Sequence, residues 1–72
     1  MKNEVISKQV GARLKEARQM ANLTQKEVAS ILNMTQQQYS RFENGVFELN
    51  YEQIIKLCKL YETTPNVIFD FD

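Results

Sequence analysis

The chain has 72 residues, which is enough for one small domain, and its nine Lys and Arg balance nine Asp and Glu. It has no His and one Cys, which excludes an internal disulfide, a zinc site of about four N or S ligands, and catalytic centres built around His. The first residues are polar and no apolar run approaches about 20 residues, so we expect neither a signal peptide nor a membrane span. These features predict a cytoplasmic protein that is not an enzyme and uses no cofactor or metal.

Charge is unevenly distributed along the chain, although the net charge is zero. Residues 1–41 carry seven Lys or Arg and three Glu, a balance of +4, whereas residues 42–72 carry two Lys and six acids, a balance of −4. The basic part offers a surface for phosphate. Ordinary surface charge that happens to segregate would look the same, so charge alone leaves both interpretations open.

The first helix is predicted from about residue 6 to 21, because apolar residues recur there at helical spacing. They are Val5 or Ile6, Val10, Leu14, Ala17 and Ala21. Gly11 inside this helix is unfavourable by about 1 kcal/mol relative to Ala, and close packing against a neighbouring element would explain its presence.

Two capping boxes predict the next two helices. In the first, the Thr24 hydroxyl accepts from the Glu27 amide, and the Glu27 side chain accepts from the Thr24 amide. Thr35 and Gln38 repeat the pattern. Between the two helices, Asn33 occupies a position where a short turn needs left-handed φ, which Asn tolerates well.

The inward residues of these two helices follow from the same spacing. Val28, Ala29 and Leu32 are expected to face the core from the second helix, and Tyr39 and Phe42 from the third. The third helix should end near Gly45, which suits a left-handed cap.

A fourth helix is predicted after the cap Asn50, and a fifth after Thr64 and Pro65. The apolar stripe expected on the fourth helix consists of Tyr51, Ile54, Ile55, Cys58 and Tyr61, flanked by Leu57 and Leu60. We expect Cys58 in the core, and Tyr51 and Tyr61 at its edge with their hydroxyls in water. The fifth helix contains Val67, Ile68 and Phe69.

Two short helices with separate Thr caps, three residues apart, are typical of a helix-turn-helix, whose second helix lies in the DNA major groove. With Tyr39 and Phe42 buried, the outward side chains are Gln36, Gln37, Ser40 and Arg41, with Gln38 at the margin. Gln can pair with the adenine edge and Arg with the guanine edge. The alternative is a solvated helix face on which Gln is present only for its helix propensity. Because these side chains lie on the second helix of the pair, we favour a DNA-binding face.

From Arg13 to Gly45 the chain resembles the Cro and lambda-type repressor (Xre-type) helix-turn-helix family, and weakly as far as Phe69. The most specific matches are Gln25 and the segment Phe42-Glu43-Asn44-Gly45. The resemblance implies an all-α, compact five-helix bundle, with one domain over residues 1–72 and the helix-turn-helix unit at about 24–45. It also implies a sequence-specific transcription regulator of double-stranded DNA, a repressor that binds an inverted-repeat operator as a homodimer.

The resemblance also assigns candidate DNA contacts. Gln36, Gln37 and Arg41 match base-reading positions of the third helix, and Ser40 joins them through its outward place. Gln25 matches a residue that touches phosphate and can support Gln36.

Further backbone contacts and one internal contact complete the set. Asn44 matches a residue that meets the DNA backbone after the third helix. Thr24, Thr35 and Gln38 are further backbone candidates, because capped helix starts present amides to phosphate. Arg18 and Glu43 match a structural ion pair between the first helix and the end of the third.

The chain departs from the family pattern after Gly45. Relatives often place Lys or Arg there, whereas this chain has Val46, Phe47 and Glu48, which predicts fewer phosphate contacts and a shallower salt dependence. Val46 and Phe47 are expected to pack onto the core instead.

Two questions about partners stay open in the sequence. Either Phe69 completes the core while Phe71 frays at the chain end, or these residues form a dimer contact. The neutral charge and the missing basic loop also fit a protein-binding module on the same fold, such as an antitoxin or anti-regulator that binds a partner protein, with RNA polymerase as another possible partner.

Overall fold

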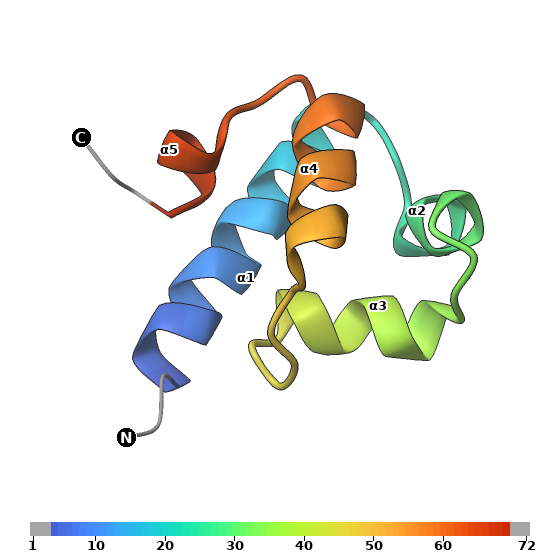
Figure 1. Cartoon of the computed structure of the whole chain (residues 1–72). Helices are drawn as coiled ribbons and strands as arrows, with labels where there is room; N and C mark the ends of the chain where they lie inside the picture. Colours follow the sequence, from blue (N-terminus) through green and yellow to red (C-terminus); the bar gives the residue numbers. More distant parts are fainter. Residues whose placement is uncertain (1–3, 70–72) are drawn as a thin grey trace.

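The computed structural model describes residues 4–69, and within them the chain forms five helices and no strand (Figure 1). They are α1 (Glu4–Met20), α2 (Gln25–Ile31), α3 (Gln36–Glu43), α4 (Tyr51–Leu60) and α5 (Pro65–Ile68). The expected all-α five-helix fold is thereby confirmed. No helix in the described part is long and apolar enough to cross a membrane.

The helix pair α2 and α3 is mounted on α1. Helix α3 packs against both α2 and α1, while α5 packs against α1 and α4. In Figure 1, α2 and α3 occupy one side of the molecule, and α5 lies on the opposite side of α1 and α4. The first turn of α3 thus lies far from both ends of the described chain.

Every predicted helix cap is present. The boxes at Thr24 and Thr35 have both reciprocal hydrogen bonds, and Thr64 caps α5 with Pro65 at its first position. A third box, which the sequence analysis missed, pairs Asn50 with Gln53. Each box satisfies amide groups that a helix start leaves without an intrahelical partner.

Four left-handed residues end the first four helices. Asn33 (φ 58°) and Gly45 (φ 75°) were expected, whereas Asn22 (φ 59°) and Glu62 (φ 52°) were not. In each case the amide after the left-handed residue donates to a carbonyl five residues back, as Met34 does to Ala29 at 2.9 Å. This is the Schellman arrangement, which any helix end can adopt when the surrounding packing requires a sharp reversal.

The core is built from nine buried residues: Leu14, Val28, Ala29, Tyr39, Phe42, Leu57, Cys58, Tyr61 and Ile68. Gly11 lies where α1 meets the end of α3, and a Cβ atom there would stand 2.3 Å from the carbonyl oxygen of Glu43. The close packing that the sequence suggested for Gly11 is therefore confirmed, and a larger residue would push α3 away from α1.

The predicted stripe of α4 was partly wrong. Tyr51 is 87% exposed and Ile55 55% exposed, whereas Leu57 is buried beside Cys58 and Tyr61. Because α4 has apolar residues on several sides, their spacing fits more than one inward face, and in the folded chain the side of Leu57 is the one that packs inward.

The hydroxyl of Tyr61 was also misjudged. It lies inside the protein, 2.6 Å from the hydroxyl of Tyr39, and not in water. Two buried Tyr residues from different helices satisfy each other, which no local pattern predicts.

Phe69 is 42% exposed at the end of α5, and Phe71 lies outside the described residues.

Candidate nucleic-acid interface

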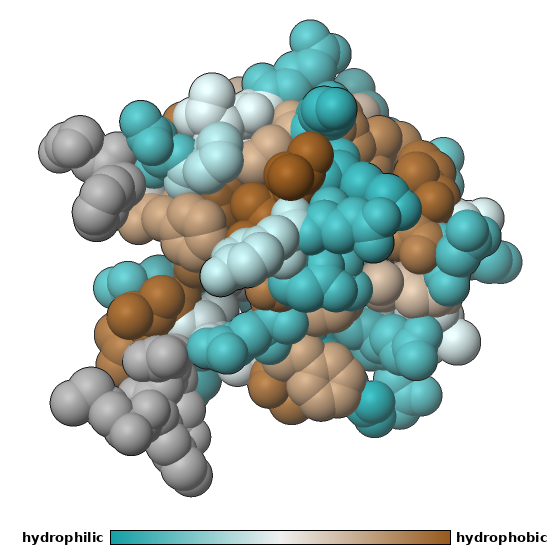
Figure 2. All heavy atoms as spheres, viewed as in Figure 1, coloured by the Kyte–Doolittle hydropathy of each residue, from teal (hydrophilic) through white to brown (hydrophobic). Residues whose placement is uncertain are grey.

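The first turn of α3 presents a continuous polar surface. Gln36, Gln37 and Gln38 are exposed, and Ser40 and Arg41 are half-buried one turn later. The turn contains no acidic residue. Figure 2 shows hydrophilic surface along the outer edge of α3, facing away from the rest of the bundle. The base-reading candidates thus share one accessible helix face.

The side chains of Thr35 and Gln38 are engaged within the helix start. The Thr35 hydroxyl accepts from the Gln38 amide at 3.1 Å, and the Gln38 side chain accepts from the Thr35 amide at 2.9 Å. Thr24 and Glu27 make the same two bonds at the same distances in α2. Any phosphate contact of these caps therefore involves the remaining backbone amides or the free hydrogen atoms of the side chains.

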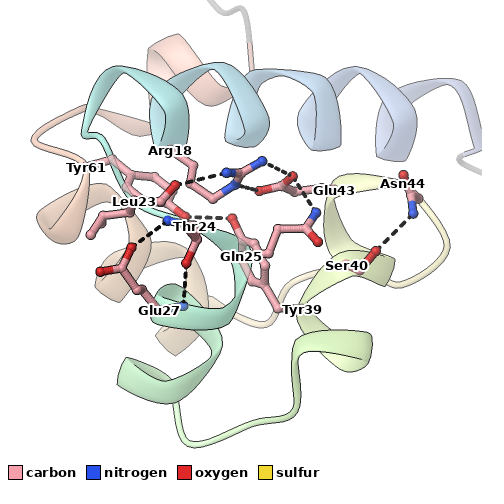
Figure 3. Close-up of polar contacts among 10 residues, drawn as sticks. All are labelled: Arg18, Leu23, Thr24, Gln25, Glu27, Tyr39, Ser40, Glu43, Asn44 and Tyr61. Carbon is pink, nitrogen blue, oxygen red and sulfur yellow. Dashed lines mark hydrogen bonds and ion pairs between the residues drawn. The ribbon is translucent and has the colours of Figure 1, made fainter.

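Asn44 lies exposed at the C-terminal end of α3. Its Nδ2 donates to Oγ of Ser40 at 3.2 Å (Figure 3). The structure thus joins a base-reading candidate and a backbone candidate in one hydrogen bond.

A buried carboxylate lies behind this surface. The side chain of Glu43 is only 2% exposed, and Nε of Arg18 lies 2.7 Å from its Oε2. Nη2 of Arg18 donates to Oε1 at 3.2 Å, and Nε2 of Gln25 donates to the same oxygen at 3.0 Å. Figure 3 shows Arg18 and Gln25 converging on Glu43 from α1 and from the start of α2. Three helices therefore meet at one carboxylate.

The ionisation of Glu43 follows from these contacts. Burial alone would raise the pKa of its carboxyl, but the hydrogen bonds from Arg18, Gln25 and Tyr39 outweigh burial and hold that pKa below its usual range. The hydrogen bond to Glu43 also raises the pKa of the Arg18 guanidinium. The pair is thus charged at neutral pH.

The contact of Gln25 differs from one expectation. Gln25 was expected to be able to support Gln36 at the start of α3, whereas its side-chain amide donates to Glu43 at the other end of that helix. Oε1 of Glu43 thereby accepts from both Arg18 and Gln25, and Nη1 of Arg18 donates to the carbonyl oxygen of Leu23 at 2.9 Å. Gln25 is fixed on its inner side by a buried charge.

The loop after α3 contradicts the expected packing of Val46. Val46 is 65% exposed and Phe47 44% exposed, and apolar surface is visible in Figure 2 where Figure 1 places this loop. Phe47 does touch the core, because its ring meets the edge of Phe42 with 6.2 Å between centroids. The guanidinium carbon of Arg41 lies 5.4 Å from the Phe47 centroid. This contact was not predicted from the sequence, because it depends on how the loop after α3 folds back onto the helix.

Within the described residues, no group of three or more His, Cys, Asp or Glu side chains is arranged to hold a metal ion. The polar groups of this face are amides, hydroxyls and guanidinium, which suit hydrogen bonding to bases and phosphates.

Comparison with known proteins agrees with this geometry. A family model described as helix-turn-helix matches residues 14–68. Over 63 residues the chain is 36% identical to the HTH-type transcriptional regulator ImmR of Bacillus subtilis (strain 168), a match that covers 88% of this chain and 50% of that protein. The chain thus spans about half the length of this relative. A capped helix pair mounted on α1, the Phe42-to-Gly45 end of α3 and these matches agree, and the chain belongs to the Cro and lambda-type repressor (Xre-type) helix-turn-helix family.

Proposed function

We propose that this domain is a transcription regulator that binds double-stranded DNA with α3 in the major groove. The observation that carries the proposal is the exposed, acid-free first turn of α3 beside a second capped helix. Gln36 and Gln37 have the chemistry to pair with adenine, and Arg41 with guanine, while Ser40 donates or accepts.

The backbone candidates fit a supporting role. Gln25 keeps one amide hydrogen free of its bond to Glu43, and Asn44 is exposed at the far end of α3. Thr24, Thr35 and Gln38 mark two helix starts, where amide groups and the helix dipole favour phosphate. Contacts of this kind fix position and carry no sequence information.

We further propose a homodimer on an inverted repeat. Helix α3 has eight residues and is therefore about 12 Å long, so one copy covers only a few base pairs. Two copies whose half-sites lie about 34 Å apart would read a longer site. The proposed action is repression, because a dimer bound over a promoter excludes RNA polymerase. The proposed location is the bacterial cytoplasm, where the DNA lies.

The test selects bound sequences from a random duplex pool and then measures stoichiometry on the selected duplex. The expected result is an inverted repeat occupied by two chains, and repression of a reporter when the repeat overlaps its promoter. A single asymmetric half-site occupied by one chain would refute the dimer, and an absence of sequence enrichment would refute the DNA-binding role.

A second candidate function is a protein-binding module that acts as an antitoxin or anti-regulator on a partner protein, or that binds RNA polymerase. The observations favouring it are the zero net charge and the exposed Val46 in a loop that carries no basic residue. Mobility shift on random duplex at low salt separates the two, because a protein-binding module would give no shift where a DNA-binding domain does.

A further inference from the structure

Phe47 is exposed on the loop between α3 and α4, close to the proposed DNA face. A ring that only completed the core would be covered, yet this residue is 44% exposed. The ring contacts the ring of Phe42, and it also lies beneath the guanidinium group of Arg41. Phe47 therefore joins the core to the one cationic base-reading candidate.

The backbone fixes where the ring lies. The amides of Val46 and Phe47 both donate to the carbonyl oxygen of Arg41, at 2.8 Å and 3.2 Å. The chain reverses at Gly45, whose φ is 75°, and a Cβ atom on Gly45 would come within 2.8 Å of the backbone of Lys8 in α1. The loop is thus folded back onto the last turn of α3 and leans on α1.

The side chain of Arg41 gains an ordered resting place from this arrangement. A guanidinium over a ring face, within about 6 Å of the centroid, is attracted by the negative potential of that face. A cation–π contact uses none of the N–H donors of Arg41, which stay available to a bidentate acceptor. A side chain that is ordered before binding loses less rotamer entropy when it binds.

We propose that Phe47 is a positioning residue for Arg41, holding its guanidinium in the orientation that reads a base. The proposal rests on the proposed DNA-binding function and deepens it. Phe47 itself contacts no base, so its effect on specificity is confined to the base position that Arg41 reads. The aromatic residue thus takes a specificity role at a place where a basic residue would add only phosphate affinity.

A purely structural role for Phe47 predicts a different pattern. If the ring only packs on Phe42, its loss lowers thermal stability and weakens binding to all sequences alike. Phe47→Leu keeps apolar volume against Phe42 but removes the aromatic face, and Phe47→Tyr keeps the face. These two variants separate positioning from packing.

The experiment uses the duplex selected from a random pool by the parent protein, together with its single-base variants. Arg41→Ala first identifies the base position at which preference is relaxed. Phe47→Leu should then lose about two- to thirty-fold of the preference at that position, the range expected for a cation over an aromatic ring. Binding to unselected duplex should stay unchanged, Phe47→Tyr should retain the preference, and Arg41→Ala/Phe47→Leu should lose no more than Arg41→Ala alone.

NMR of the free protein gives a second measurement that needs no DNA. The δ protons of Arg41 should be shifted upfield by the ring current of the parent and of Phe47→Tyr, and should move back in Phe47→Leu. An unshifted Arg41 in the parent, an equal loss at every base position, or a full preference in Phe47→Leu each overturns the positioning role. A parent that enriches no sequence overturns the proposed function as well, so the two failures are told apart.

Discussion

Helices α2 and α3 begin alike and differ at one informative position. Both start at a Thr whose hydroxyl accepts from the third helical residue, and the bond lengths of the two boxes agree. The reciprocal partner is the charged Glu27 in α2 and the neutral Gln38 in α3. A negative charge at a helix start is stabilising, so stability alone would favour Glu in both places. The neutral amide in α3 fits the helix start that is proposed to enter the major groove.

The other end of α3 follows the opposite rule. There a charged residue, Glu43, is buried and bound to Arg18 of α1 and Gln25 of α2. The exposed start of α3 thus avoids an acid that would stabilise it, while its buried end keeps an acid that needs two partners. We expect DNA binding to depend on the first turn of α3, and the stability of the fold to depend on its C-terminal end.

The largest effect is expected from removing the buried carboxylate. Glu43→Ala leaves Arg18 without its charged partner in a site where the Arg18 side chain is 11% exposed. Breaking a buried pair in this way destabilises by about 3–5 kcal/mol, and we expect that loss in the free energy of unfolding measured by urea titration.

A double-mutant cycle supplies the control for this prediction. Arg18→Ala and Glu43→Ala should be strongly non-additive, because the second change removes the charge that the first left unpaired. The exposed pair of Lys56 and Glu52, 3.9 Å apart, should couple by less than about 0.5 kcal/mol. Additivity within about 0.3 kcal/mol at Arg18 and Glu43 would show that they are not a coupled unit.

Acid should weaken the same junction by protonating Glu43. The folded pKa of this carboxyl lies below the unfolded value of 4.5, so its contribution is complete above pH 4.5 and is lost as the pH falls through the folded pKa. The effect should be smaller than truncation, because a protonated carboxyl still forms hydrogen bonds. Thermal unfolding followed from neutral to acid pH should show a shallower decline in Glu43→Gln than in the parent; equal declines would contradict the prediction.

The parts of this fold that the sequence predicted are those with local causes. The helix starts were predicted from their N-cap residues, because a cap side chain bonds to the amide three residues later. These caps are Thr24, Thr35 and Asn50. Gly45 announces a helix end because few other residues adopt its left-handed φ at low cost. These signals need no knowledge of the rest of the chain.

The parts that failed depend on long-range packing. The predicted inward face of α4 was partly wrong because apolar residues lie on several of its sides, and the hydroxyl of Tyr61 has its partner in Tyr39, 22 positions away. The exposure of Val46 follows from the reversal at Gly45 against α1. For the candidate site, periodicity placed the outward face of α3, but the contact of Arg41 with Phe47 required the loop geometry.

A smaller effect, confined to DNA binding, should distinguish base contacts made by α3 from backbone contacts made by α2. Arg41→Ala in α3 should cost about 1–3 kcal/mol of discrimination at one base position. Gln25→Ala, at the start of α2, should weaken binding to all sequences about equally, because a backbone contact carries no sequence information. Titrations of the selected duplex and its single-base variants measure both. Equal loss at every base position for Arg41→Ala would remove that residue from base reading.

The smallest effect comes from exchanging the residues that distinguish the two helix starts. Gln38→Glu keeps a side chain that can accept from the Thr35 amide, as Glu27 does from Thr24, and adds a charge that favours the helix start by about 0.3–1 kcal/mol. The variant should therefore unfold at a slightly higher denaturant concentration while binding every duplex more weakly, because the new charge meets phosphate. Glu27→Gln is the matched change in α2: it should lose a similar amount of stability and strengthen binding to every duplex alike, because Thr24 and Gln25 of the same turn are proposed backbone contacts. If Gln38→Glu bound DNA as tightly as the parent, the first turn of α3 would not lie against phosphate, and the neutral amide at this position would need another explanation.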